Sequence, residues 1–476
     1  MKGLLEKLVF RHPWIETAGL LVSVFALTWM KFYHHELWKD EWQAWFVAKD
    51  KNFFEVLSFL NYEGHPALWY LYLKPFTWLT GLIPVDEEHL LSFAHLIPAC
   101  LVFYLFWKKF DIPDIFKILF SFSYFLIFEY GIVNRGYILV ILCLFAAVFF
   151  LKKDNRQGLA WSLLLLCQTE VFGVFMALAL AVYLYMTDKK QYIKPLQFTA
   201  IGLIIFVISV FPRESGHIAK TQGKILKFGD RILTSWQGNL TNAFLPGITP
   251  DTSLFGWNII GILLTAVLLA GTWLTFRHDK KILVTFALVL GMSFGFSLLF
   301  FVGGIRQWGM MAVFFLALLA LTGTKAVANL VPFIFIFMLG LVQSIYGIKA
   351  LQSDISMPFS NARAAGLFIK DKIPEKVPVV AINKFEITPV VGYAKRKFYE
   401  LPSGEPFSYF KWVEKIYIPT QEELRLFARY KGVGGIVIIA PKKLDPGRFS
   451  DAVLGKEFTA KNIKNENYYL YTLSAR

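Results

Sequence analysis

Four residues that could perform acid–base chemistry occur close together, between two apolar runs. They are Asp40 and Glu41 in WKDEWQAWFVAKD (38–50), and Glu63 and His65 in NYEGHPALWY (61–70). A carboxylate at such a boundary could take a proton from an attacking hydroxyl, or it could bind a metal ion. A structural explanation also exists, because Asp40 can be a helix N-cap and Glu41 a first-turn acid favoured by the helix dipole.

The turn at Glu63-Gly64-His65-Pro66 is harder to explain by structure alone. Gly64 permits a tight turn, and Pro66 suits the first turn of a following helix. Neither requirement accounts for the choice of Glu63 and His65. We therefore expect these two side chains to belong to a functional site.

Three later interruptions of apolar sequence add ionisable groups. They are Glu129, Asn134 and Arg135 in FEYGIVNRGYIL (128–139), Gln168, Thr169 and Glu170 in LLLLCQTEVFGV (163–174), and Arg306 in GGIRQWG (303–309). An arginine between apolar runs is costly unless it is paired, so Arg135 either holds a phosphate or pairs with Glu129. A buried Glu170 needs a cation or a metal ion as partner. Arg306, beside two glycines, is a candidate for bidentate phosphate binding.

A basic stripe is expected in the segment 213–255. Its members recur at helical spacing: His217, Lys220, Lys224, Lys227 and Arg231. A helix with this stripe would rest on a membrane, with its cations towards anionic groups. Those groups are either ordinary anionic lipids or a lipid-linked phosphate that Lys220 and Lys224 would bind.

The composition places the chain in a membrane. Of its 476 residues 56% are hydrophobic, the mean hydropathy is +0.50, and apolar runs near membrane-spanning length recur. The net charge of +15 would fit nucleic acid, but basic residues also collect at the cytoplasmic ends of membrane helices, so no nucleic-acid partner is expected. The three cysteines lie in apolar runs and form no metal or disulfide pattern.

Charge at the ends of the apolar runs predicts a topology. Eleven runs are expected to cross the membrane: 14–33, 87–107, 113–130, 135–151, 157–169, 171–187, 195–212, 256–276, 282–302, 308–323 and 327–347. If the Lys and Arg clusters face the cytoplasm, the run 66–83 cannot cross. We then expect 38–50, which has helical periodicity and three tryptophans, to lie as an amphipathic helix in the outer interface.

The tail changes character near residue 355. VPVVAIN (377–383), GGIVIIAPKK (434–443) and NENYYLYTL (465–473) are typical of strands, and PTQEELRLFARYKG (419–432) of a helix capped by Thr420 and Glu423. Strand and helix alternate, which predicts a small α/β domain. The predicted fold class is therefore a polytopic α-helical membrane protein, with a transmembrane domain over 1–350 and a soluble extracytoplasmic α/β domain over 351–476.

These features together predict a transferase at a membrane surface. Carboxylates that activate an acceptor and cations that stabilise a phosphate leaving group would meet on one face of the bilayer. A transporter or flippase for a lipid-linked saccharide could use the same cations, but the sequence shows no inverted repeat. A polysaccharide polymerase or ligase of another fold is the third possibility.

The residues 10–190 resemble the GT-C glycosyltransferases, in the branch with aminoarabinose transferases and protein O-mannosyltransferases. The resemblance rests on the acidic pair after the first span, the Trp-rich helix, and Glu-Gly-His-Pro before an aromatic segment. It implies an inverting enzyme of the plasma (inner) membrane that moves a sugar from a polyprenyl-phosphate donor to a lipid, glycan or protein acceptor on the extracytoplasmic side.

The resemblance also implies roles for residues. Asp40 matches the family's catalytic acid in the first loop, Glu63 an acid before the next membrane segment, and His65 the place of a lysine. Asn134 and Arg135 stand where related enzymes place an arginine and a further acid, but no carboxylate follows Arg135 here. Glu129 or Glu170 substitutes for it, or no metal site forms. A divalent metal thus stays an open possibility, and the cofactor is unknown.

Overall fold

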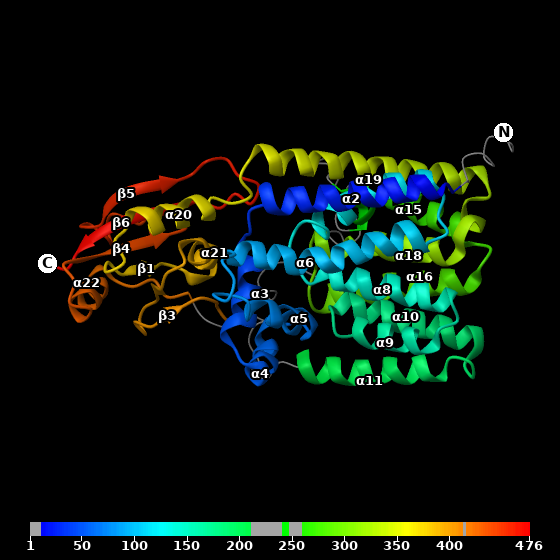
Figure 1. Cartoon of the computed structure of the whole chain (residues 1–476), viewed down its shortest axis with the longest axis horizontal. Helices are drawn as coiled ribbons and strands as arrows, with labels where there is room; N and C mark the ends of the chain where they lie inside the picture. Colours follow the sequence, from blue (N-terminus) through cyan, green and yellow to red (C-terminus); the bar gives the residue numbers. More distant parts are fainter. Residues whose placement is uncertain (1–10, 211–239, 247–258, 413–415) are drawn as a thin grey trace.

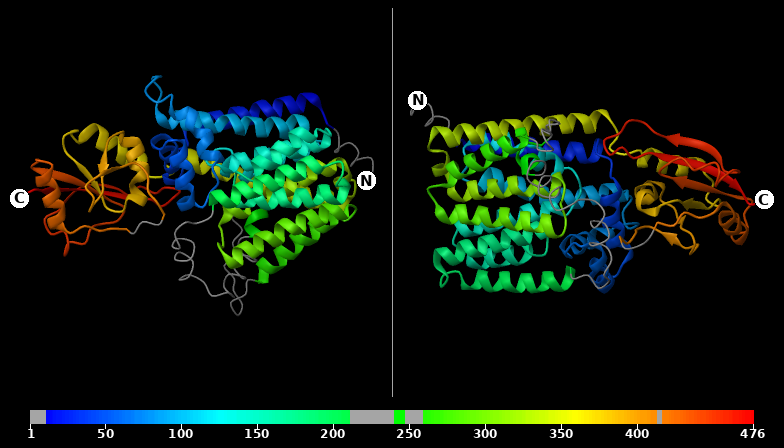
Figure 2. Two further views of the ribbon diagram at one scale, coloured as in Figure 1. Left: turned by 90° about the horizontal axis from the view of Figure 1, so that it is seen from below. Right: turned by 180° about the vertical axis from the view of Figure 1, so that it is seen from behind.

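The protein is a helical bundle with a smaller sheet domain beyond one end of it (Figure 1). This computed structural model describes residues 11–210, 240–246, 259–412 and 416–476. Three short helices lie between the bundle and the sheet domain in each view of Figures 1 and 2: α3 (Lys39–Asp50), α4 (Phe53–Glu63) and α5 (Leu68–Thr77). The start and the end of the chain are at opposite ends of the molecule.

The bundle is built from the predicted apolar runs. Seven helical segments in the described part of the chain are long and apolar enough to cross a membrane: α2 (Pro13–Tyr33), α6 with η1 (Glu87–Lys109), α10 (Val171–Asp188), α11 (Ile193–Val210), α16 (Lys280–Leu299), α17 to η4 (Ile305–Val327) and α19 (Leu330–Ser356). Shorter helices form over the other four runs: α7 (Asp114–Ser121) followed by the π-helix η2 (Tyr124–Glu129), α8 (Tyr137–Lys152), α9 (Arg156–Leu166) and α15 (Ile259–Phe276).

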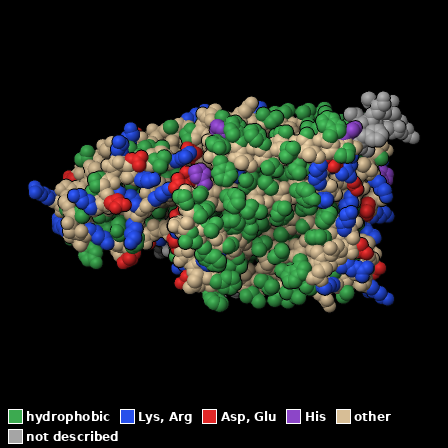
Figure 3. Space-filling view, viewed as in Figure 1, with side chains coloured by type: hydrophobic (Ala, Val, Ile, Leu, Met, Phe, Trp, Pro, Cys, Tyr) green, Lys and Arg blue, Asp and Glu red, His purple; other side chains and the backbone are tan. Residues whose placement is uncertain are grey.

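Side-chain chemistry divides the bundle along its length. Figure 3 shows hydrophobic side chains covering its visible face, with charged side chains gathered at the two ends of this apolar band. Apolar surface of this extent is stable against lipid and not against water. The protein is therefore a polytopic helical membrane protein with an additional sheet domain, as predicted.

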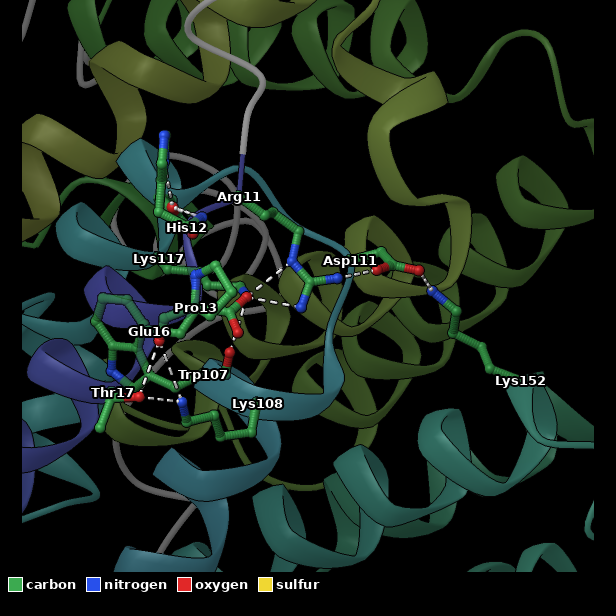
Figure 4. A network of polar contacts seen from close by, with 11 residues as sticks. Arg11, His12, Pro13, Glu16, Thr17, Trp107, Lys108, Asp111, Lys117 and Lys152 are labelled. Carbon is green, nitrogen blue, oxygen red and sulfur yellow. Dashed lines mark hydrogen bonds and ion pairs between the residues drawn. The ribbon is translucent and has the colours of Figure 1, made fainter.

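A polar network joins the helices at the end of the bundle far from the sheet domain (Figure 4). Glu16 of α2 accepts hydrogen bonds from Arg11 and from Lys117 of α7, both at 2.7–2.8 Å, and Lys152 of α8 pairs with Asp111 at 3.2 Å. Further contacts at this end join the turns after α8 and α10, and the first turn of α16 to the last turn of α10. The basic clusters that were predicted to share one side of the membrane thus lie together.

Helix α3 is not the exposed interfacial helix that its periodicity predicted. Every residue from Glu41 to Ala48 is buried. Helix α21 (Lys384–Ala394) of the sheet domain packs on α3, and a Cβ atom at Gly392 would lie 2.4 Å from the Trp42 ring. Trp42 is therefore buried in the interface between α3 and the sheet domain. The sheet domain covers the face of α3 that the sequence assigns to the membrane surface. Helix α5 has 10 residues, too few to cross a bilayer, as predicted.

The sheet domain contains one six-stranded sheet of order β3-β2-β1-β4-β6-β5. Its strands are β1 (Val379–Ala381), β2 (Phe398–Tyr399), β3 (Pro406–Phe407), β4 (Gly435–Ala440), β5 (Val453–Phe458) and β6 (Tyr468–Ser474). The central strands β2, β1 and β4 are parallel, and the outer pairs are antiparallel. Such a mixed sheet accepts helices on both faces.

Alternate side chains of the central strands pack on opposite layers. Val379 and Ala381 join the core that includes α20 (Ala362–Lys372) and α21, whereas Val380 and Ile382 pack with Leu424 of α22 (Gln421–Tyr430). The predicted strands β1, β4 and β6 and the capped helix α22 are present, with Thr420 and Glu423 forming the capping box. Helices α20 and α21 and strands β2, β3 and β5 were not predicted, and α19 continues past the predicted domain boundary to Ser356.

Candidate functional site

An ion-pair cluster forms where the bundle meets the short helices. Asp40 lies in the first turn of α3, and its Oδ2 atom is 2.7 Å from Nη1 of Arg135 and 3.4 Å from Nη1 of Arg306. Arg135 belongs to the turn before α8, and Arg306 to the short helix α17 (Ile305–Trp308). Nε of Arg306 is 3.0 Å from Oε1 of Glu129. The alternative pairing of Arg135 with Glu129 is therefore not formed.

Five of the predicted residues line one cavity beside this cluster. Its volume is about 60 Å³. Its polar lining includes Asp40, Gln43, Glu63, His65, Tyr70, Arg135, Thr169, Glu170 and Trp412. The five predicted residues, Asp40, Glu63, His65, Arg135 and Glu170, come from four separate segments, and Arg306 contacts Asp40 from outside the lining.

Two of the three carboxyl groups of the cavity, Asp40 and Glu63, differ in their electrostatic surroundings. Burial raises the pKa of Asp40, but the positive charges of Arg135 and Arg306 outweigh it and hold this pKa below its usual value. Burial raises the pKa of Glu63, whose oxygens accept hydrogen bonds from Gln43 Nε2 (2.9 Å) and the Tyr70 hydroxyl (3.3 Å). Asp40 is therefore an anion, whereas Glu63 keeps its proton to a higher pH, a division typical of acid–base sites.

His65 is the partner that Glu170 requires. Its Nδ1 atom is 2.8 Å from Oε2 of Glu170, at the start of α10. Burial lowers the pKa of His65, and the adjacent Glu170 carboxylate more than compensates, so that this pKa lies above its usual value. This pair forms part of the cavity wall.

The cavity does not offer the ligands that a divalent metal would need. Asp40 is engaged by two guanidinium groups, which repel a cation, and Glu170 is paired with His65. Among the residues that the structure describes, three potential ligands approach one another closely at Asp86, Glu88 and His89, away from this cavity.

Glu41 and Asn134 were predicted to act in the site but are placed behind it. Glu41 is completely buried and accepts hydrogen bonds from the backbone N–H groups of Trp38 (2.9 Å) and Asn134 (2.6 Å). The Asn134 side-chain oxygen accepts a hydrogen bond from Lys31 at 2.6 Å. Neither lines the cavity. The structure thus places Glu41 and Asn134 outside the cavity lining, where both hold the turn that carries Arg135 against α3.

Two further predicted residues, Lys220 and Lys224, lie outside the described residues.

Several residues of the site were not singled out by the sequence. Gln43 follows Asp40 by three positions, and this helical spacing on one face could have revealed it. Trp412 and Lys464 come from the sheet domain, and no local signal marks them. The Lys464 ammonium lies 4.1 Å from the centre of the Trp38 ring, which the Arg306 guanidinium also faces at 5.0 Å. The site is thus completed by the sheet domain.

Comparison with known proteins gives a likeness of fold. No protein-family model matches the chain, and no curated protein matches its sequence. Two crystal structures of ArnT from Cupriavidus metallidurans are similar to it: one bound to undecaprenyl phosphate, the other in the apo state. Each covers 96% of this chain, and the matches span 97% and 98% of the ArnT chains, with a TM-score of 0.44 and 11% sequence identity.

Proposed function

We propose that this protein is an inverting glycosyltransferase that moves a sugar from a polyprenyl-phosphate donor to an acceptor hydroxyl. The observation that carries the proposal is the Asp40 carboxylate, facing a cavity at the end of a membrane-spanning bundle, with two arginines from separate segments against it. A base next to paired guanidinium groups suits a reaction in which a hydroxyl attacks and a phosphate leaves.

The reaction would proceed by one displacement. The acceptor oxygen forms a bond to the anomeric carbon of the donor sugar, and Asp40 takes the hydroxyl proton. The bond from that carbon to the phosphate oxygen breaks on the opposite side, which inverts the configuration. The phosphate leaves with the bonding electrons, and Arg135 and Arg306 stabilise its added charge.

The remaining lining groups would orient the sugar. Glu63, whose pKa is raised by burial, would form a hydrogen bond with a sugar hydroxyl, and Gln43 and Tyr70 fix its position. His65 and Glu170 offer one donor and one acceptor in the same cavity. The hydrogen bonds that these groups make would decide which sugar is accepted.

The membrane position is part of the proposal. The basic clusters gather at the end of the bundle far from Asp40, and the positive-inside rule assigns that end to the cytoplasm. The cavity and the sheet domain would then face the extracytoplasmic side of the plasma membrane, with the polyprenyl chain in the bilayer and Lys220 and Lys224 as further phosphate ligands. Reporter fusions at residues 110 and 240 should report opposite sides of the membrane.

The test is the release of polyprenyl phosphate by the purified full-length protein. The substrates are polyprenyl-phosphate sugars with a mixed pool of lipid, glycan and peptide acceptors. Asp40→Asn should abolish release and retain donor binding, whereas Asp371→Asn, an exposed carboxylate of α20, should change neither. Full turnover by Asp40→Asn would refute the assignment of the base. Movement of the donor across vesicles without release would instead show a transporter.

A further inference from the structure

A second, larger opening lies in the sheet domain, at the carboxyl ends of the parallel strands β1 and β4. The chain leaves β1 into α21, on one face of the sheet. After β4 it runs to Phe449, which packs with α22 on the other face. Neighbouring parallel strands whose following segments part in this way open a crevice at their carboxyl ends, where open α/β sheets bind their ligands.

The crevice has the size and lining of a ligand site. Its volume is about 570 Å³, against about 60 Å³ for the Asp40 cavity. A volume of this order accommodates several sugar-sized units, whereas the Asp40 cavity does not. Its lining includes Asn383, Glu386, Lys442, Arg448 and the apolar side chain of Ile418.

Asn383, in the crevice lining, has an unusual backbone conformation and an unpaired side-chain oxygen. Its backbone has φ +69°, a left-handed conformation that non-glycine residues seldom adopt. It precedes α21 but makes no capping hydrogen bond with its side chain, and its buried Oδ1 atom has no hydrogen-bond partner. A strained backbone that presents an unused acceptor is a recurrent feature of ligand sites.

The balance of charge indicates the class of ligand. Three cations and three acids line the crevice: Lys442, Lys443, Arg448, Glu386, Asp445 and Glu466. Three asparagines, Asn383, Asn465 and Asn467, add amide donors and acceptors. The equal numbers of cations and acids favour neither a positive nor a negative ligand. The lining offers both hydrogen-bond donors and acceptors, which a polyhydroxylated molecule requires.

Two bridges connect the crevice to the catalytic end of α3. Glu386, on the crevice wall, holds the Lys39 ammonium at 3.0 Å from each of its oxygens, and Lys39 immediately precedes Asp40. Lys464, next to the lining residue Asn465, lies over the ring of Trp38. The crevice and the Asp40 cavity are therefore adjacent.

We propose that this crevice binds a saccharide portion of the acceptor and directs one of its hydroxyls towards Asp40. The inference rests on the proposed glycosyltransferase function. It assigns the sheet domain an acceptor-binding role, and Asn383 and Lys442 the recognition of sugar hydroxyls.

Binding can be measured without any donor. The probes are maltotetraose, cellotetraose and tetragalacturonic acid, titrated into the full-length protein in nanodiscs and followed by saturation-transfer NMR. At least one should bind the wild type, and Asp40→Asn should bind it with the same Kd. Asn383→Gly, which tolerates the positive φ, and Lys442→Glu should each weaken binding about tenfold or more. Lys456→Glu, an exposed control on β5, should leave it unchanged.

The outcomes separate the two proposals. Failure of all three saccharides to bind the wild type, or undiminished binding by both crevice variants with normal melting curves, would overturn the inference. Release of polyprenyl phosphate to water in the absence of acceptor should be the same in the control Lys456→Glu and the wild type. Saccharide binding by a wild type that releases no polyprenyl phosphate would leave the crevice as a sugar site and end the transferase proposal.

Discussion

Asp40 and Arg135, 95 positions apart in the sequence, form a 2.7 Å ion pair that joins α3 to the turn before α8. Their side chains are 18% and 17% exposed, so solvent screens the pair only in part. Arg306 extends the pair to a third segment and to Glu129. This chain of charges fixes the base and the proposed phosphate ligands relative to each other before any substrate binds.

Replacement of Arg306 by alanine should weaken donor binding about 10- to 100-fold, the value of one or two lost charged hydrogen bonds. Isothermal titration with a polyprenyl-phosphate sugar measures this directly. Arg363→Ala, on α20, removes a half-exposed arginine paired with Glu88 and serves as the control. An unchanged donor Kd in Arg306→Ala would remove Arg306 from the site.

Gln43 ties the sheet domain to the cavity. Its Nε2 atom donates to Phe410 O (2.7 Å) and to Glu63 (2.9 Å), and its Oε1 atom accepts from Phe410 N (3.1 Å). Gln43→Ala leaves the Phe410 amide without this partner. Hydrogen exchange of the Phe410 amide should therefore accelerate at least about tenfold, and the rate of sugar transfer should fall. Gln421→Ala removes an amide that bonds only within the sheet domain and is the matched control. Equal exchange at Phe410 in both variants would contradict the role of Gln43.

His35 should make stability depend on pH. Its ring is fully buried between Glu41 (3.2 Å) and Asp354 (2.9 Å), and, although burial opposes it, these carboxylates raise its pKa from about 6.5 to about 9. A pKa that is higher in the folded than in the unfolded protein stabilises the fold fully below pH 6.5, and this contribution disappears as the pH rises through 9.

Comparison with a neutral variant isolates this effect from other titrating groups. At pH 6 the unfolding free energy of His35→Gln should be lower than that of the wild type by a difference on the order of 3 kcal/mol. This difference in unfolding free energy should disappear by pH 10. A gap between wild type and His35→Gln that is constant from pH 6 to pH 10 would show that the imidazolium charge does not contribute.

The sequence by itself determined the helices of the bundle and part of the sheet domain. The apolar runs predicted the helices of the bundle because each run must satisfy its own backbone polar groups in lipid. Apolar runs bounded by turn residues predicted β1 and β4, and a capping box predicted α22. The sequence also selected Asp40, Glu63, His65, Arg135 and Glu170, because ionisable groups at the edges of apolar runs are costly without a role.

Only the tertiary structure decided how these groups are paired and which of them reach the cavity. Glu41 carries the same carboxylate as Asp40 one position away, but the 100° rotation between neighbours in a helix turns it into the core towards His35. The partners of Asp40 and the arrival of Trp412 and Lys464 from the sheet domain depend on contacts between distant segments. Such contacts follow from how helices and domains pack, and local sequence patterns carry no record of that packing.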